Sequence, residues 1–293
     1  KNGGKLPIIT SCSPGWIKYC EYYYPEMLEN LSSCKSPQQM FGAITKTWYA
    51  KKMGIDPKDI FVVGIMPCTA KKFEVARDDE SASGYPDVDV ALTTRELGRM
   101  ISRAHINFKA LPDEAFDNPL GDSTGAGTIF GATGGVMEAA LRTAAEWLEE
   151  KPLDNVDFKE VRGTDTIKEA VYKVAGMDVK VAVTSGLKGA HELMERVKNG
   201  ETFHFIEVMG CPGGCVNGGG QPIQSATTRS FVDLKAKRAA ALYEADADMP
   251  LRKSHENPAI KMVYEEFLDK PGSHTAHHVL HTSYVDRSKD VIR

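Results

Sequence analysis

The chain has 293 residues, 42% hydrophobic content and a formal net charge of −4, which is typical of a globular protein and excludes intrinsic disorder. Lysine and arginine are interspersed with acids and form no tract longer than a pair. Nucleic acid and anionic membranes are therefore poor candidate partners. No apolar run approaches the roughly 20 residues that a membrane-spanning helix needs.

Short apolar runs alternate with helical stretches along the chain. The first part predicts strand 6–10, helices 16–30 and 37–53, strands 60–66 and 88–94, and helix 94–103. The later part predicts helix 134–150, strand 179–186, helix 186–199, strand 203–210 and helix 229–246, then two short helices broken at Pro271-Gly272. Apolar strands alternating with helices indicate an α/β fold.

A seam between two lobes is expected in the acidic, proline-containing segment 110–120, "ALPDEAFDNPL", which a glycine-dense turn at 121–135 follows. We divide the chain into a first lobe, 1–115, and a second lobe with the C-terminal helices, 116–293. Each lobe is expected to hold a small, mainly parallel sheet flanked by helices.

Four of the six cysteines occupy Gly/Pro turns directly after predicted strands: Cys12, Cys68, Cys211 and Cys215. Ligands of open α/β sheets bind beyond the carboxyl ends of the strands, so these three loops are expected to converge on one site. Cys20 and Cys34 lie in or beside helical sequence, where small packed thiols are the ordinary interpretation. Six cysteines are too few for a disulfide scaffold in a chain of this length.

The turn "GCPGGC" separates Cys211 and Cys215 by three residues, two of them glycine. Both thiolates can face one compact object while backbone amides remain free to donate to it, which is typical of iron–sulfur clusters. Zinc is the competing interpretation, but it usually needs a second close pair of ligands. The following "NGGGQP" lacks the features of a P-loop or dinucleotide motif. The four histidines near the C-terminus, His274, His277, His278 and His281, are expected to face solvent or cap helices.

The three cysteine segments resemble the signatures of the iron-only (FeFe) hydrogenases. "TSCSPGW" (10–16) is similar to TSCCPxW, "MPCTAKKFE" (66–74) to MPCxxKxxE, and "EVMGCPGGCVNGGGQP" (207–222) to ExMACxxGCxxGGGxP. The resemblance runs from about residue 6 to the end, and the motifs follow in the family's order. Other family-like stretches include "SSCKSPQQMFG" (32–42) and "GAGTIFGATGGVMEAALR" (125–142).

The resemblance implies an H-cluster, a 4Fe-4S cubane joined through a cysteine sulfur to a diiron unit with CO, CN⁻ and a bridging dithiolate. It would lie buried in the cleft between the lobes. By position, Cys68 and Cys211 match cubane ligands, and Cys215 matches the cysteine that bridges the two units. Lys71 matches a lysine that hydrogen-bonds a cyanide. The other residues that the resemblance assigns to the cofactor pocket are Met66, Pro67, Glu74 and Met209, with Glu74 orienting the lysine loop.

The first motif departs from the family pattern, because Cys12 and Ser13 stand where the pattern has two adjacent cysteines. Matched by position, Cys12 keeps the proton-relay thiol, and Ser13 replaces a cubane ligand with a hydroxyl. An alkoxide is harder and more basic than a thiolate, so its bond to iron should be weaker. Alternatively, Cys12 ligates iron and Ser13 lies near the proton path, or the serine is an engineered change. Ser32 matches a hydroxyl of the proton path.

The implied activity is reversible reduction of protons to H2. A sensory or electron-transfer iron–sulfur protein on the same scaffold is the alternative, because of Ser13. A non-catalytic cluster-assembly relative is disfavoured by Lys71 and the complete third motif.

The implied partners are H2, protons and a redox carrier. We expect a ferredoxin or cytochrome, acting through an upstream iron–sulfur domain or a partner subunit, and a small subunit is a further candidate. Family domains carry additional sequence ahead of the first motif, which residues 1–5 cannot supply. The first residues lack the h-region of a secretory signal. Cysteine usage fits a reducing interior, so a cytoplasmic location is expected, although an anaerobic periplasm would also tolerate it.

Overall fold

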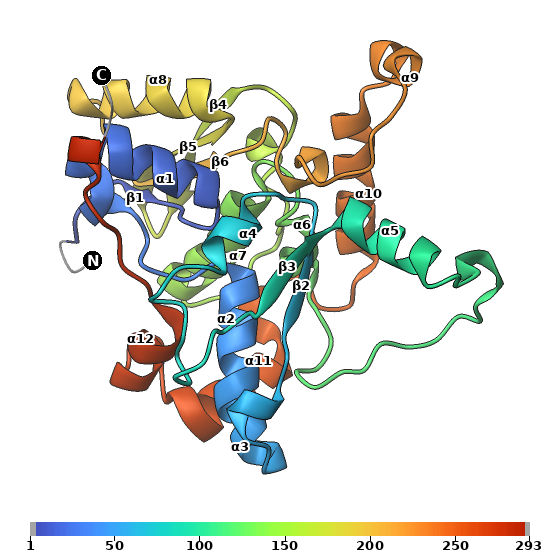
Figure 1. Ribbon diagram of the computed structural model, residues 1–293. Helices are drawn as coiled ribbons and strands as arrows, with labels where there is room; N and C mark the ends of the chain where they lie inside the picture. The colour runs from blue at the N-terminus through green and yellow to red at the C-terminus, as the bar shows by residue number, and fades with distance from the viewer. Residues whose placement is uncertain (1–3, 291–293) are drawn as a thin grey trace.

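The computed structural model describes residues 4–290 and contains two separate sheets (Figure 1). The larger sheet has the order β1-β6-β5-β4 and comprises β1 (Ile8–Ile9), β4 (Ile167–Val174), β5 (Met177–Ser185) and β6 (Phe205–Met209). The smaller sheet pairs β2 (Val63–Met66) with β3 (Val90–Thr93) in parallel. All pairs except β4–β5 are parallel, so the predicted α/β fold with two small, mainly parallel sheets is confirmed.

Strand β4 is the one strand among residues 4–290 that the sequence analysis did not predict. It joins β5 through a tight turn in which Ala175 and Gly176 both have positive φ. Burial alternates along β4 from Lys168 to Val174, as expected of an antiparallel edge strand with one solvated face. The sequence "IKEAVYKV" does not follow this alternation, because Lys168 is 7% exposed whereas Val171 is 59% exposed.

The helices of the first part of the chain surround the smaller sheet and β1. They are α1 (Pro14–Tyr23), α2 (Pro37–Ile44), α3 (Ala50–Met53), α4 (Lys71–Glu74) and α5 (Thr94–Arg103), and a π-helical turn at Thr45–Tyr49 joins α2 to α3. The predicted helix 16–30 ends early, because Pro25 begins a 3-10 helix, Pro25–Asn30. Thr93 and Glu96 form a capping box that starts α5 directly after β3.

The later helices cover the larger sheet and extend to the C-terminal segment. They are α6 (Gly125–Ile129), α7 (Gly135–Glu149), α8 (Leu187–Lys198), α9 (Ala226–Phe231), α10 (Leu234–Asp248), α11 (Pro258–Val263) and α12 (His274–Leu280). A π-helical turn, Tyr264–Leu268, extends α11, and the break at Pro271-Gly272 is confirmed. Short 3-10 turns lie at Pro57–Asp59, Phe108–Ala110, Lys159–Val161, Cys215–Asn217, Ser254–Glu256 and Ser288–Asp290. No helix within residues 4–290 is both long and apolar enough to cross a membrane.

The hydrophobic cores combine residues from both ends of the chain. Ile9 and Trp16 pack in one cluster with Ile206 from β6, and Trp48 packs with Val279 from α12 in another. The division at residue 115/116 stays a prediction, but strand pairing and core packing both cross it. The outermost residues of the two ranges, 1–3 and 291–293, lie outside the described part of the chain.

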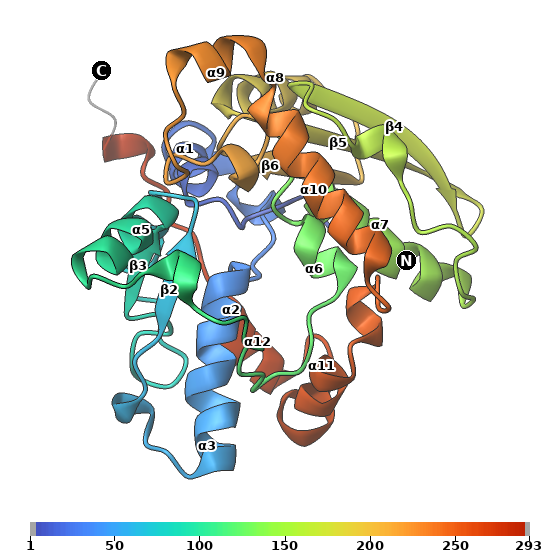
Figure 2. The same ribbon diagram turned by 90° about the vertical axis from the view of Figure 1, so that its right-hand side faces the viewer.

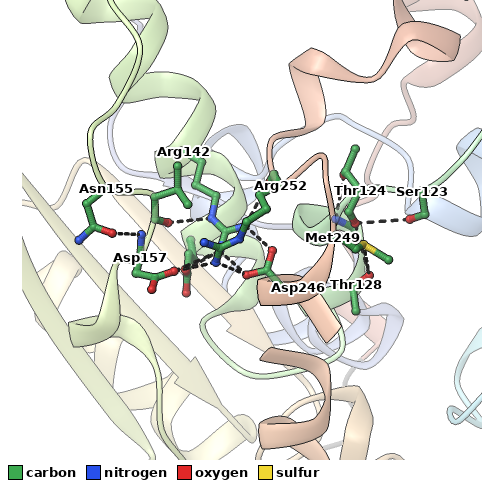
Figure 3. A network of polar contacts seen from close by, with 12 residues as sticks. Ser123, Thr124, Thr128, Arg142, Asn155, Asp157, Asp246, Met249 and Arg252 are labelled. Carbon is green, nitrogen blue, oxygen red and sulfur yellow. Dashed lines mark hydrogen bonds and ion pairs between the residues drawn. The ribbon is translucent and has the colours of Figure 1, made fainter. Parts of the chain in front are cut away.

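A buried ion-pair network attaches the C-terminal segment to α7 (Figure 3). The guanidinium of Arg142 on α7 lies 2.7 Å from Asp246 of α10 and 2.8 Å from Glu138, and all three side chains are fully buried. Arg252 binds the same Asp246 at 2.6 Å. Figure 2 shows α10 lying alongside α6 and crossing α7. A Cβ on Gly125 would meet Asp246 Oδ1 at 1.9 Å, so the glycine-dense turn lets α6 approach α10 closely.

Candidate active site

The three cysteine loops meet beyond the carboxyl ends of their strands. Cys12 follows β1, Cys68 follows β2, and Cys211 follows β6. The amide of Gly220 donates to the carbonyl of Pro67 at 3.0 Å, which joins the third motif to the second. Lys71 Nζ donates to the carbonyl of Cys12 at 3.0 Å, which joins the second motif to the first. The predicted convergence of the loops is therefore confirmed.

The motif thiols are free, and the surroundings of Cys211 and Cys215 disfavour their ionisation. Burial raises the pKa of Cys215 to about 12, with Cys12, Cys68 and Cys211 adding to the shift and Lys71 opposing it. Burial, followed by Cys68, also raises the pKa of Cys211. Thiolates bind metal, so a positively charged metal centre would supply the charge that favours their deprotonation. These buried thiols are therefore suited to holding a metal centre.

Within residues 4–290, the one group of three metal-binding side chains whose ligand atoms all lie within 4.8 Å is Glu146, His255 and Glu256, and it contains no cysteine. A tetrahedral zinc needs four close ligands. The thiols of the three loops do not form such a close group in the described residues.

Glycines let the backbone of the third motif approach its neighbours closely. A Cβ on Gly218 would lie 1.9 Å from the carbonyl oxygen of Pro67, and one on Gly214, where φ is +94°, would lie 2.6 Å from the amide of Thr133. The amide of Thr133 donates to the carbonyl of Gly213, which places Thr133 beside the turn. The hydroxyl of Thr133 is buried and has no hydrogen-bond partner. The glycines therefore let the third motif pack closely against the loops of Pro67 and Thr133. The hydroxyl of Thr133 remains unpaired beside it.

Lys71 lies inside the site, as predicted. Its side chain is 10% exposed, and Nζ lies 2.8 Å from Glu74 Oε1. Glu74 in turn accepts hydrogen bonds from Ser36 Oγ at 2.7 Å and Gln38 Nε2 at 2.8 Å. The neighbouring Lys72 is 44% exposed and pairs with a different acid. Glu74 therefore orients the buried ammonium, while a role of Lys71 toward a cofactor stays a prediction.

Cys12 and Ser32 line one groove of about 710 Å³, whose other walls are mostly aliphatic. Burial raises the pKa of Cys12 to about 11, Lys71 opposes the shift, and Glu207 adds to it. The Ser32 hydroxyl accepts a hydrogen bond from the amide of Cys34 at 3.3 Å. The structure therefore brings the two predicted proton-path residues to a common surface.

Three further predicted pocket residues lie at the strand ends. Met66 and Met209 are the last residues of β2 and β6, with Met66 partly buried and Met209 2% exposed. Pro67 contributes its carbonyl to the bond with Gly220. Their contacts with a cofactor stay predictions.

Ser13 lies beside the third motif. Its hydroxyl accepts a hydrogen bond from the amide of Gly210 at 3.0 Å and makes no hydrogen bond that caps its own helix, α1. The position adjoining Cys211 agrees with the assignment of Ser13 near the cubane, while ligation of iron by Ser13 stays a prediction.

The sequence analysis missed Glu207, which is fully buried on β6. Its carboxylate accepts hydrogen bonds from the amides of Gly134 and Met137, each at 2.7 Å, at the start of α7. Burial raises its pKa, while these amides and Lys168 oppose the shift. An acid within the apolar run "FIEVM" was the available signal, because a buried strand rarely carries an unpaired carboxylate.

Three cations that brace the third motif were also missed. Arg238 of α10 donates to the carbonyl of Val216 at 2.8 Å, and Arg95 of α5 donates to that of Gln221 at 3.1 Å. The side chain of Lys235 packs against Gly213. Their partners are remote in sequence, so no local pattern indicated these contacts.

The fold and the cysteine loops define an α/β protein built to hold an iron–sulfur cluster. Residues 1–219 match the family described as the iron-only hydrogenase large subunit, C-terminal domain, and residues 232–287 match the iron hydrogenase small subunit. The chain belongs to the iron-only hydrogenase family.

Several relatives cover nearly the whole chain. It is 54% identical to the NADP-reducing hydrogenase subunit HndD of Solidesulfovibrio fructosivorans, over 97% of this chain and 48% of that protein. It is 48% identical to iron hydrogenase 1 of Clostridium pasteurianum, over 97% and 50% respectively. Protein NAR1 of Arabidopsis thaliana is 34% identical, over 95% and 61%. The chain thus spans about half the length of the hydrogenases that it matches.

Solved structures agree with this assignment. A variant of the FeFe-hydrogenase HydA1 from Chlamydomonas reinhardtii superposes with a TM-score of 0.82 at 40% identity, covering 96% of this chain and 76% of that one.

The family implies an H-cluster with a 4Fe-4S unit, and the residues present fit it. The donor set consists of soft thiols from three loops, and the turn that carries Cys211 and Cys215 is lined by glycines. Thr133 adds a buried hydroxyl without a partner beside that turn.

Proposed function

We propose that this chain is the catalytic part of an iron-only hydrogenase that reversibly reduces protons to H2. The observation that carries the proposal is the partly buried contact between Lys71 and the carbonyl of Cys12, at 3.0 Å. This contact brings an ammonium group of the second motif to the backbone of the first motif, and the charge of Lys71 also acts on the thiol of Cys215. A buried ammonium needs an anionic partner, and Glu74 supplies it through both carboxylate oxygens, at 2.8 and 3.0 Å. A bond from Lys71 to a cofactor would therefore take the place of one of its three present hydrogen bonds.

The cofactor that we propose is a 4Fe-4S cubane joined to a diiron unit with CO, CN⁻ and a bridging dithiolate. Cys68 and Cys211 would hold the cubane, and Cys215 would bridge the two units. Ser13 has the sequence position of a further cubane ligand, while its hydroxyl accepts the amide of Gly210. When bound, this group supplies an electron store and an open metal site for making or splitting H2.

The chain itself would bind the group, orient it and move protons. Lys71, held by Glu74, would donate a charge-assisted hydrogen bond to a cyanide. Cys12, with its pKa raised to about 11, is a protonated thiol at neutral pH and can act as the proton donor. The hydroxyl of Ser32, in the same groove, would pass the proton onward. Because the groove is mostly aliphatic, it would limit access of water to this region.

The electron partner that we propose is a ferredoxin or a cytochrome, reached through an upstream iron–sulfur domain or a partner subunit. The two hydrogenase relatives described above are about twice as long as the matched region, which leaves room in those proteins for further redox domains. The match of residues 232–287 to the small-subunit family favours a small subunit supplied by the same chain.

A second candidate function is a cluster protein without H2 turnover, either a sensor or an electron carrier. Ser13 at a ligand position favours it, and relatives at 33–34% identity include proteins that are not named as hydrogenases, among them Protein NAR1. We favour the hydrogenase because identity rises to 48–54% with hydrogenases and because Lys71 lies in the site.

Anaerobic maturation followed by an assay of H2 evolution with reduced methyl viologen tests the proposal. We expect H2 production together with an iron content above that of a cubane alone. Full iron loading without H2 would favour the sensor or electron carrier, and a chain that retains only the cubane would favour an assembly-type relative.

A further inference from the structure

Ser13 and Gly210 lie in direct contact although 197 positions separate them. The chain departs from the quoted family motifs at both positions, with serine in place of cysteine and glycine in place of alanine. The Ser13 hydroxyl accepts the Gly210 amide at 3.0 Å. Gly210 connects Met209, the end of β6, to Cys211. The contact therefore acts on the backbone immediately before a proposed cubane ligand.

The contact also restricts which side chain can occupy position 210. A Cβ built on Gly210 would lie 2.6 Å from Ser13 Oγ, while the next neighbours, the amide of Trp16 and Ser13 Cβ, are at 3.8 and 3.9 Å. The serine hydroxyl is therefore the single close obstacle to an alanine. The hydroxyl cannot rotate away without releasing the Gly210 amide.

We propose that Ser13 and Gly210 form a coupled pair that positions the Cys211 loop, with Ser13 as a positioning residue acting through the Gly210 amide. The hydroxyl fixes the start of the third motif against the start of α1, and the glycine leaves the space that the hydroxyl occupies. Each departure from the family motif thus accommodates the other. The consequence for a bound cluster rests on the proposed function, whereas the pairing itself does not.

The contact between Ser13 and Gly210 also occupies a hydrogen-bond donor, the amide of Gly210. In an iron–sulfur protein, amides that donate to cluster sulfurs stabilise the more negative, reduced state and raise the reduction potential. While Ser13 holds the Gly210 amide, that amide is unavailable to the sulfur of Cys211. Removing the hydroxyl frees the donor one residue from the thiolate, so we expect the cubane potential to rise.

A double-mutant cycle on the cluster-free protein tests the pairing directly. Ser13→Ala and Gly210→Ala should each lower the midpoint of thermal unfolding by about 2–8 °C, from a lost hydrogen bond and from a steric clash respectively. In the Ser13→Ala background, Gly210→Ala should cost less than half as much, because the obstacle is gone. Ser11→Ala is the matched control, since Ser11 bonds the carbonyl of Cys34 instead and should show no coupling with Gly210→Ala.

A second measurement follows the cubane after chemical reconstitution with iron and sulfide, without the diiron unit. Ser13→Ala should raise the reduction potential in an electron paramagnetic resonance titration, and Ser11→Ala should leave it unchanged. Ser13→Thr, which retains the hydroxyl, should restore the parent potential. Additive effects in the thermal cycle would overturn the pairing even if the protein evolves H2. Coupling without a change in potential would overturn the role toward Cys211.

Discussion

Lys71 and Lys72 are adjacent in the sequence but have different surroundings. Lys71 bonds Glu74 and the carbonyl of Cys12 in the interior, whereas Lys72 pairs with Glu96 at the surface. Replacing Lys71 with Asn should lower H2 evolution and cofactor occupancy by about 10- to 150-fold, because one charge-assisted hydrogen bond worth about 1.5–3 kcal/mol is lost. Activity and iron content provide the measurement.

Lys72→Asn is the matched control and should behave like the parent. The fold of the Lys71 variant should persist, because Glu74 keeps Ser36 and Gln38 as donors. Equal cofactor occupancy in the two variants would show that Lys71 does not contribute to binding the cofactor.

Cys12 and Ser13 separate two assignments of the first motif. If Ser13 stands at the cubane ligand position, Ser13→Cys should stabilise the cluster and shift its potential, because a soft and more acidic ligand replaces a hydroxyl. Cys12→Ala should then keep the cubane and slow H2 evolution by about 10²–10⁴-fold, as expected for a general acid–base residue. Iron content and H2 evolution of both variants are measured. Loss of iron in Cys12→Ala, with Ser13→Cys equal to the parent, would reverse the assignment.

Local sequence was sufficient to find the cysteines and Lys71, since their motifs are contiguous and follow strands. It was insufficient for Glu207, whose amide partners lie about 70 residues earlier, and for the contact between Ser13 and Gly210. The Glu207 contacts depend on how α7 packs against β6, and the Ser13 contact depends on how β1 pairs with β6. The sequence alone did not specify either arrangement.

Helix α10 braces the third motif through Arg238, whose guanidinium donates to the carbonyl of Val216. Arg238→Ala should loosen the Cys215 loop and lower iron retention, because the hydrogen bond from a charged donor contributes about 1.5–3 kcal/mol. Lys237→Ala, an exposed neighbour on the same helix, is the control. Iron retention after gel filtration gives the comparison, and equal retention in both variants would mean that α10 does not support the loop.

Lys35, just before α2, pairs with two buried acids. Its Nζ lies 2.6 Å from Asp87 Oδ2 and 3.6 Å from Glu80 Oε2. Burial raises the pKa of Glu80 from 4.5 to about 7, with Lys35 opposing the shift. The folded state therefore binds more protons than the unfolded state between about pH 4.5 and 7, so the contribution of Glu80 to stability falls as pH rises through this range.

Glu80→Gln should accordingly gain stability relative to the parent as pH rises from 5 to 8. Urea unfolding at both pH values measures the difference. A constant difference between the two proteins would show that Glu80 titrates normally.

At the scale of elements, the strands that are short apolar runs were predicted at nearly their observed positions. Strand β4 was missed because "IKEAVYKV" mixes charged and apolar residues without regular alternation: Lys168 is buried and Val171 is exposed. The predicted helix 229–246 is split into α9 and α10 at Val232–Asp233, where Asp233 caps the second helix. Side-chain capping of this kind is visible in the sequence only after the boundary is known.

In the whole molecule, segments from the two ends of the chain pack into the same sheet and the same cores. β1 joins the sheet of the later half, α11 and α12 join the core of α2, and the network around Arg142 ties α10 to α7. Composition and the seam at 110–120 predicted a linear division into lobes, because sequence patterns report neighbours along the chain. The cysteine loops are brought together by this interleaving, and the site depends on the integrity of both halves.

Infrared spectroscopy of the anaerobically matured protein tests the central claim most directly, because bound CO and CN⁻ absorb where the polypeptide does not. We expect bands of both ligands in the parent protein. Cys215→Ala should lose them while keeping part of the cubane signal, because only the bridge is removed. The absence of these bands from a protein fully loaded with iron, or their persistence with full activity in Cys215→Ala, would contradict the assignment of this chain as a hydrogenase catalytic unit.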